Sequence, residues 1–117
     1  MKVHSIEAFV PSGADMSLSK QLFQDLGFTI NWDQRDYTGF EKDGCKFILQ
    51  NYNQKEFAEN LMLSVQVSDV EEFRNFILDK KLVEKYGIRI SEVTTQPYGK
   101  EVNLIDLAGV CWHFVQQ

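Results

Sequence analysis

Polar side chains capable of hydrogen bonding or proton transfer recur on predicted strands whose other residues are apolar. Side chains alternate between the two faces of a strand, so the residues of each strand form two sets. One set is apolar throughout and is expected to pack under a helix. The other set mixes the polar residues Glu7, Gln50, Ser64 and His113 with the apolar residues Phe9, Ile48, Met62, Cys111 and Val115. Apolar walls with a few polar groups are typical of a ligand pocket. In the alternative, the apolar members pack at a dimer interface or against neighbouring strands.

Glu7 and His113 are the two residues of this set with acid–base chemistry. If the mixed faces line one cavity, the two side chains are expected to approach each other across it. They would then form an ion pair or an acid–base couple that holds a polar ligand. The alternative is a structural pair in which each group satisfies the other's hydrogen-bonding capacity.

Cysteine chemistry is not expected to carry the function. Cys45 and Cys111 each follow a glycine turn, and as free thiols they fit a cytosolic protein. A disulfide between them is the alternative. A catalytic cysteine needs a base to activate it, and the chain has only two histidines, His4 and His113.

The elements that must position these residues occur twice in the same order. Residues 3–50 and 61–116 each contain a strand, a helix that opens near an Asp and ends at a Gly, and a run of strands. At 117 residues the chain has the length of one domain. The pattern predicts an α+β domain, 1–117, made of two βαβββ repeats at about 1–52 and 61–117. Their curled mixed sheets are expected to face a shared cleft.

The element boundaries follow from capping residues and turn signals. In the first repeat, a strand over 3–10 precedes a helix that Asp15 or Ser17 caps and Gly27 ends. In the second repeat, Asp69 caps a helix that reaches residue 86, with a break or bend at Lys80-Lys81. The remaining strands are predicted at 28–33, 37–42, 45–51, 61–68, 88–93, 100–106 and 111–116, with a linker at 52–60 and a loop at 96–99.

Composition excludes several classes of protein. Hydrophobic residues make up 44% of the chain and aromatic residues 13%, which favours a globular fold. The net charge of −5 and the scattered Lys and Arg residues argue against a nucleic-acid partner. No apolar run approaches the roughly 20 residues that span a bilayer, and the N-terminus lacks a signal-peptide core. We therefore expect a cytoplasmic protein that binds neither nucleic acid nor membrane.

Three sequence segments together carry a resemblance to a known family. They are the stretch from Phe9-Val10-Pro11-Ser12 to Leu22-Phe23-Gln24-Asp25-Leu26-Gly27-Phe28, the helix opening Val67-Ser68-Asp69-Val70, and the hairpin from Gly99 through Asp106-Leu107-Ala108-Gly109-Val110. In order and spacing they resemble the vicinal-oxygen-chelate superfamily, which contains glyoxalase I, bleomycin-resistance proteins and extradiol dioxygenases. The resemblance covers nearly the whole chain. It implies the paired βαβββ fold and a homodimer.

The same resemblance bears on metal binding. In metal-using members four ligands come from the first and last strands of each module, and the matching positions here are Glu7, Ile48, Met62 and His113. Ile48 cannot bind a metal, and the Met62 thioether is a poor ligand for hard divalent ions. At most two of the four positions are competent, whereas a catalytic metal site usually has three protein ligands. We therefore expect no metal and no cofactor.

The sequence thus predicts a metal-independent small-molecule binding protein that acts by sequestration, as resemblance to bleomycin-resistance proteins suggests. That resemblance also suggests an aromatic rim stacking on a flat ligand. A metal-dependent lyase or dioxygenase is one alternative, and a non-catalytic structural or interaction module is another. The predicted ligand-binding residues are Glu7, Phe9, Trp32, Phe40, Ile48, Gln50, Met62, Ser64, Tyr98, Cys111 and His113.

Overall fold

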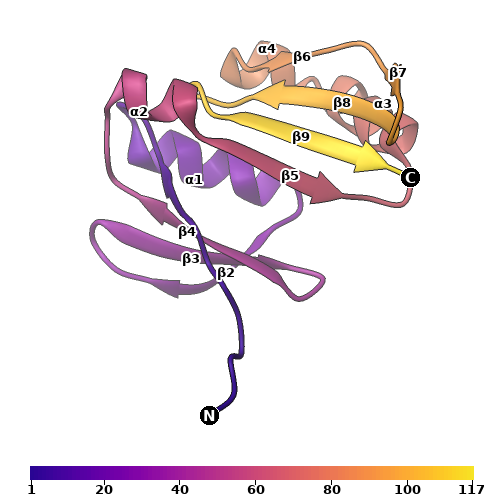
Figure 1. The fold of residues 1–117 in the computed structure, drawn as a ribbon. Coiled ribbons are helices and arrows are strands. Elements are labelled where there is room, and N and C mark those ends of the chain that lie inside the picture. The colour runs from indigo at the N-terminus through magenta and orange to yellow at the C-terminus, as the bar shows by residue number, and fades with distance from the viewer. The chain divides into compact units, whose positions relative to one another are not determined.

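The computed structural model describes residues 1–117, which divide into two compact units (Figure 1). The N-terminal unit is Met1–Gln54 and the C-terminal unit is Lys55–Gln117. Each unit contains one sheet with helical segments. None of the helices has the length and apolar character needed to cross a bilayer.

The N-terminal unit has a four-stranded sheet of order β1-β4-β3-β2. The β1 and β4 strands are parallel, and the other neighbours are antiparallel. Its elements are β1 (Phe9–Pro11), α1 (Met16–Asp25), β2 (Thr29–Asp33), β3 (Tyr37–Lys42) and β4 (Cys45–Gln50).

An aromatic cluster joins α1 to one face of this sheet. The helix begins after Asp15, whose side chain accepts a hydrogen bond from Leu18 N, as the capping prediction required. Phe23 on α1 contacts the rings of Phe40 and Phe47, with centroids 5.8 and 5.0 Å apart. All three rings are buried. Their burial fixes which face of the sheet is covered and leaves the opposite face open.

The C-terminal unit has the strand order β5-β9-β8-β6, with β7 also paired to β8. The β5 and β9 strands are parallel, and Phe73 of α3 stacks on Phe114 of β9 with centroids 3.9 Å apart. Its elements are α2 (Lys55–Asn60), β5 (Met62–Gln66), α3 (Val70–Asp79), α4 (Leu82–Tyr86), β6 (Arg89–Ile90), β7 (Thr94–Gln96), β8 (Gly99–Ile105) and β9 (Cys111–Gln116).

The two sheets repeat one topology. In each, the first strand lies parallel to the last strand, and the remaining strands follow in reverse chain order. The predicted α+β fold of two βαβββ modules is therefore confirmed. The predicted break at Lys80-Lys81 is also present, since α3 ends at Asp79 and Lys81 takes a left-handed backbone (φ 55°) before α4.

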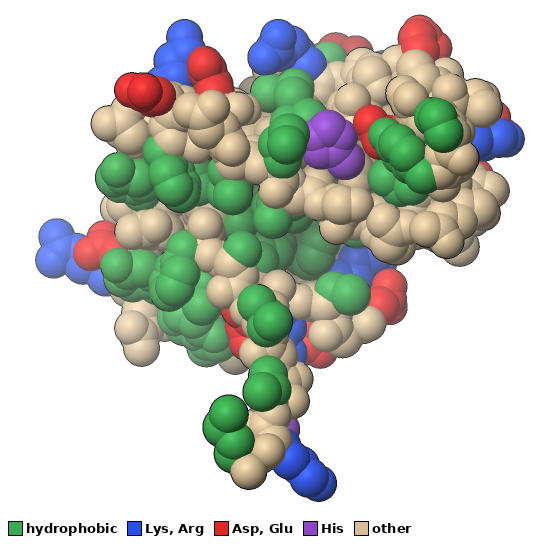
Figure 2. Space-filling view, in the orientation of Figure 1, with side chains coloured by type: hydrophobic (Ala, Val, Ile, Leu, Met, Phe, Trp, Pro, Cys, Tyr) green, Lys and Arg blue, Asp and Glu red, His purple; other side chains and the backbone are tan.

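Some predicted boundaries were wrong; among them, the strand predicted over 88–93 is confined to β6, Arg89–Ile90. The strand predicted over residues 3–10 is confined to Phe9–Pro11, and residues before it form an extended arm with exposed apolar side chains (Figure 2). The segment before Phe9 has no neighbouring strand, so its residues do not form an apolar face covered by a helix. The Ile6 side chain, for example, is 92% exposed. The predicted linker contains α2, and the predicted loop at 96–99 is the turn of a β7–β8 hairpin in which Gln96 pairs with Gly99.

Candidate functional site

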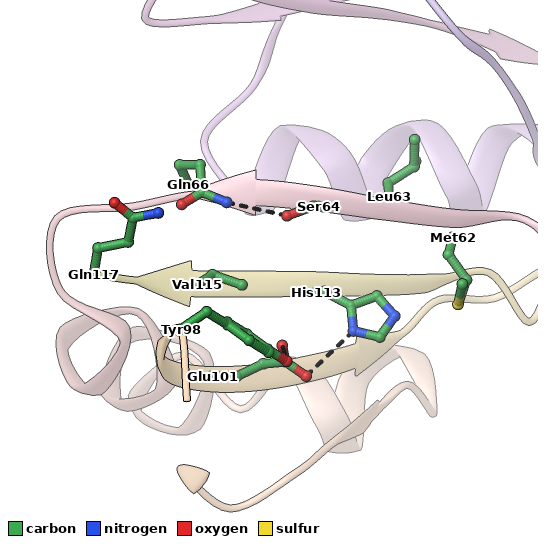
Figure 3. Close-up of a pocket in the computed structure, with 9 residues that line it drawn as sticks. All are labelled: Met62, Leu63, Ser64, Gln66, Tyr98, Glu101, His113, Val115 and Gln117. Carbon is green, nitrogen blue, oxygen red and sulfur yellow. Dashed lines mark hydrogen bonds and ion pairs between the residues drawn. The ribbon is translucent and has the colours of Figure 1, made fainter. Parts of the chain in front are cut away.

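A pocket of about 540 Å³ lies on the open face of the C-terminal sheet, the face turned away from α3 (Figure 3). Alternation along β5, β8 and β9 brings their open-face side chains together. Ser64 pairs with His113 across β5 and β9, and Asn103 pairs with His113 across β8 and β9. The pocket is lined by Met62, Leu63, Ser64, Gln66, Tyr98, Glu101, His113, Val115 and Gln117.

Glu101 is the electrostatic centre of this pocket. Its carboxylate accepts a 2.6 Å hydrogen bond from the Tyr98 hydroxyl and lies 3.3 Å from His113 Nδ1 (Figure 3). Glu101 is only 6% exposed. The hydrogen bond from Tyr98 lowers the pKa of the Glu101 carboxyl, with further bonds from His113 and Asn103 acting against the effect of burial. A buried, ionised carboxylate with several donors is therefore built into the sheet.

The β8–β9 connection holds His113 in place relative to Glu101. Asp106 Oδ1 accepts hydrogen bonds from the backbone N–H groups of residues 108, 109 and 110, and its Oδ2 accepts one from Trp112 Nε1 at 2.9 Å. These bonds fix the turn that sets the register of β8 against β9. That register places Glu101 opposite Val115 and Asn103 opposite His113.

A second pocket, of about 420 Å³, lies on the open face of the N-terminal sheet and is lined by Phe9, Trp32, Gln34, Tyr37 and Ile48. A register shift between Ile30 and Trp32 creates it. Ile30 pairs with the buried Phe40, whereas Trp32, two residues later, pairs with Gly39. Without the extra residue, Ile30 and Trp32 would share a face. The bulge therefore turns the Trp32 indole to the open side.

Gly39 provides the seat for this indole. A Cβ atom at residue 39 would collide with the ring nitrogen of Trp32 and its neighbouring carbons, so the absence of a side chain lets the indole lie against the backbone. Phe9 and Tyr37 pack edge to face beside it, with centroids 5.9 Å apart. The Trp32, Phe9 and Tyr37 rings, called the aromatic platform below, are 37–52% exposed.

Solved structures of known proteins share this fold. The chain is 20% identical to a bleomycin-binding protein from Streptomyces verticillus complexed with copper(II)-bleomycin, covering 99% of each chain with a TM-score of 0.76. It is 17% identical to a bleomycin resistance determinant encoded on transposon Tn5 (97% and 98% covered, TM-score 0.79). It is 12% identical to the fosfomycin resistance protein FosX from Listeria monocytogenes (99% and 91% covered, TM-score 0.77).

The chain has the glyoxalase/bleomycin-resistance fold. The fold expected from the sequence is thereby confirmed, over nearly the full length of the chain. No protein-family model and no curated protein sequence matches it.

Ten of the eleven predicted ligand-binding residues fall into three groups on this fold. Met62, Ser64, Tyr98 and His113 line the C-terminal pocket. Phe9, Trp32 and Ile48 line the N-terminal pocket. Gln50 and Cys111 lie on the open faces of their sheets outside these linings, and Glu7 lies in the N-terminal arm, where it accepts a hydrogen bond from Ser5 Oγ at 2.7 Å.

Phe40 was wrongly predicted as a ligand-binding residue. Its side chain is 0% exposed and stacks on Phe47, with centroids 5.3 Å apart, under α1. The alternation of β3 explains this position: Gly39 is on the open face, so Phe40 must be on the covered face.

Glu101 and Asn103 were missed by the sequence analysis. The mixed strand faces predicted from the sequence belong to the first and last strand of each module, and β8 is not among these strands. The same alternation applied to residues 99–105 would have placed Glu101, Asn103 and Ile105 on the face that carries His113. The signal was present in the sequence.

The remaining side chains with possible chemistry are those that could bind a metal and the two cysteines. The structure forms no group of three His, Cys, Asp or Glu side chains that could hold a metal ion. Cys45 and Cys111 are both free thiols. Burial raises the pKa of the Cys111 thiol, and the nearby carboxylates of Glu101 and Asp106 raise it further, so this thiol is a weak nucleophile.

Proposed function

We propose that this protein is a metal-independent small-molecule binding protein that sequesters its ligand without making or breaking a bond. The observation that carries the proposal is the Trp32 indole, turned to the open face by a bulge and seated on Gly39. A regular strand would have placed this ring on the covered face. An exposed, fixed indole beside Phe9 and Tyr37 is suited to stack on a flat ligand.

The similar structures support a binding role. Two of the neighbouring proteins are described as complexes with bleomycin or copper(II)-bleomycin. We propose by analogy that this chain binds a drug-like compound, and each unit offers its own candidate contact surface. These are the aromatic platform in the N-terminal unit and, in the C-terminal unit, the pocket that contains His113, called the His113 pocket below. Glu7, Gln50 and Cys111 are retained as proposed contacts on the basis of the sequence.

Metal independence is supported by the residues at the positions that the resemblance assigns to metal ligands. Ile48 offers no donor atom, and Met62 offers only a thioether. Ile48 instead lines the N-terminal pocket beside the aromatic platform. The ligand is therefore proposed to be held by stacking and hydrogen bonds.

Fluorescence titration tests this function directly. The chain has two tryptophans, and Trp112 is buried with its Nε1 donating to Asp106, so ligand-dependent emission is expected from Trp32. Metal-free bleomycin and a panel of planar aromatic compounds are titrated in the presence of a chelator. At least one is expected to quench emission, and Trp32→Leu should remove that response and weaken binding by about tenfold, the loss of roughly 1.4 kcal/mol of stacking.

A matched control separates stacking from general damage. Tyr52→Leu removes another exposed aromatic ring from the same unit outside the pocket, and should leave affinity unchanged. Binding that requires added metal, or that is equally tight in Trp32→Leu, would contradict the proposal.

We also propose that the protein is a homodimer. The arm before β1 is extended and carries the exposed apolar side chains Val3 and Ile6 (Figure 2). The backbone of an extended segment is available to pair with a strand edge, and its apolar side chains gain from burial. A second copy of the chain would supply both.

A further inference from the structure

We propose that the His113 pocket binds a positively charged nitrogen group, such as an amidinium, guanidinium or ammonium, through His113 Nε2 and Asn103 Oδ1. The proposal rests on the binding function proposed above and names the ligand chemistry that this pocket selects. His113 Nε2 and Asn103 Oδ1 are buried and have no hydrogen-bond partner in the protein. The proposal depends on this pair of unused acceptors.

The first step fixes the protonation of the imidazole. His113 Nδ1 lies 3.3 Å from Glu101 Oε2. A carboxylate only accepts hydrogen bonds, so Nδ1 carries the proton in this pair. In the neutral imidazole the other nitrogen, Nε2, is then an acceptor with a free lone pair. The carboxylate thus selects the tautomer that leaves an acceptor unused.

The second step fixes the orientation of the Asn103 amide. Asn103 contributes a hydrogen bond that favours the charged form of Glu101, so its NH₂ group points to the carboxylate. Its Oδ1 atom is left without a donor. Since Asn103 pairs with His113 across β8 and β9, the two unused acceptors belong to neighbouring residues on one face.

The third step concerns the sign of the charge. Glu101 is held ionised and is nearly buried, so the pocket carries a negative charge in a region of reduced dielectric constant. The charged or titratable side chains on this face are Glu101 and Tyr98 beside His113, Cys111 two residues away on β9, and the exposed Arg89 of β6, which lies opposite Ile105 at the edge of the sheet. The β5 strand contributes the uncharged Met62, Ser64 and Gln66. Two acceptors backed by a carboxylate favour a ligand group that brings both N–H donors and positive charge.

Access to the two acceptors requires a side chain to move, because both atoms are covered. Met62 is a diagonal neighbour of His113 on the same face and lines the same pocket (Figure 3). Its side chain is unbranched and 69% exposed, so it can rearrange without disturbing the core when a ligand enters the pocket. The apolar groups of Met62 and Val115 would then contact the hydrocarbon part of the ligand.

Nitrogen NMR of the ¹⁵N-labelled protein tests the tautomer without any ligand. The chain has only two histidines, so a His4→Gln variant assigns the His113 signals. In the neutral form of the imidazole, we expect His113 to carry its proton on Nδ1 and none on Nε2. A neutral imidazole that carries its proton on Nε2 would overturn the proposal.

Three probes of one shape test the charge preference. Benzamidine, benzamide and benzoate share a planar ring and differ in their head groups, which are cationic, neutral and anionic. Binding is followed through the His113 ring signals and by thermal shift. We expect benzamidine to bind at least tenfold more tightly than the other two. Benzamidine binding no tighter than benzoate would overturn the proposal, whether or not either probe binds.

Charge-matched variants assign the preference to this pocket. Glu101→Gln is expected to reduce the affinity for benzamidine at least tenfold. Glu92→Gln changes the net charge equally, but the exposed Glu92 side chain pairs with Arg74 outside the pocket, so this variant should have no effect. Equal affinity in both variants would place the probe elsewhere. If Trp32 emission responds to ligands but head-group charge does not matter, this inference fails and the proposed function stands.

Discussion

At the scale of single residues, Gly39 determines where the Trp32 indole lies on the N-terminal sheet. The Trp32 indole occupies the space that a side chain at position 39 would fill. Glycine is therefore required by a close approach of side chain to backbone. A methyl group there must push the indole off the sheet, because the backbone of β3 is fixed by pairing to both β2 and β4.

Gly39→Ala is predicted to displace Trp32 while preserving the fold. The indole is partly exposed and can move outward, so we expect the free energy of unfolding to fall by only about 1 kcal/mol. The emission maximum of Trp32 should shift to longer wavelength and its response to ligands should be lost. Cys45→Ala, an exposed change in the same sheet, is the control. An unchanged spectrum in Gly39→Ala would show that Trp32 is not seated there.

Glu101 gives a second residue-scale prediction, which concerns pH. Hydrogen bonds lower its pKa, chiefly the bond from Tyr98, so the folded state holds the proton more weakly than the unfolded chain. The stabilisation is therefore complete above the ordinary glutamate pKa and is lost as the pH falls through the folded-state value. The contribution of Tyr98 to stability depends on pH in the opposite direction. Because the pKa of Tyr98 is raised in the folded state, its contribution is lost as the pH rises through the folded-state pKa.

Glu101→Gln is accordingly predicted to lower the free energy of unfolding by about 1–3 kcal/mol at neutral pH. The difference from the wild type should be smaller at about pH 3, which is below the ordinary glutamate pKa, because protonation of the carboxyl removes the stabilising ionised form. Urea unfolding at both pH values measures this. A difference that stays constant with pH would mean that the ionised carboxylate is not the stabilising form.

At the scale of elements, the helices depend on side-chain caps of unequal strength. Asp69 accepts hydrogen bonds from both Glu71 N and Glu72 N, at 3.0 Å each. Asp15 accepts one, from Leu18 N at 3.0 Å. Each bond satisfies an N–H group that the first turn of the helix leaves unpaired.

Asp69→Ala is predicted to destabilise the protein by about 1–2 kcal/mol, and Asp15→Ala by about 0.5–1 kcal/mol. Asp69→Asn keeps an accepting oxygen and should recover most of the loss. The denaturant midpoints of the three variants measure these changes in stability, provided that the free energy of unfolding depends equally steeply on denaturant concentration in each. A larger loss for Asp15→Ala would contradict the hydrogen-bond pattern.

At the scale of the whole molecule, the arm before β1 is the feature that a single chain leaves unexplained. Pairing with the sheet begins at Ala8, whose carbonyl oxygen accepts a hydrogen bond from Ile48 N at 2.9 Å. The residues before it are predominantly exposed, including Val3 and Ile6. A homodimer would bury these side chains.

Deletion of residues 2–7 is predicted to convert a dimer into a folded monomer. The melting temperature of the full chain should rise with protein concentration, because association stabilises the folded state by mass action, and that dependence should vanish in the shortened chain. Sedimentation measures the mass in parallel. A full chain that is monomeric at all concentrations would refute the dimer.

The sequence by itself determined features that depend on nearest neighbours along the chain. Caps at Asp15 and Asp69, the break at Lys80-Lys81 and the duplicated element order were all predictable, because each depends on local backbone preferences and on periodic burial. Alternation also assigned His113 and Ile48 to the open faces. The same alternation places Phe40 on the covered face of β3 and Glu101 on the open face of β8.

Only the tertiary structure decided what depends on pairing between distant segments. The bulge that turns Trp32 outward exists because β2 pairs with β3 in a shifted register, and nothing in residues 29–33 alone specifies that shift. Glu101 meets His113 because β8 and β9 are aligned by the Asp106 turn. Residues 3–8 have strand-like alternation, yet they form no strand in one chain because a strand needs a partner for its backbone hydrogen bonds.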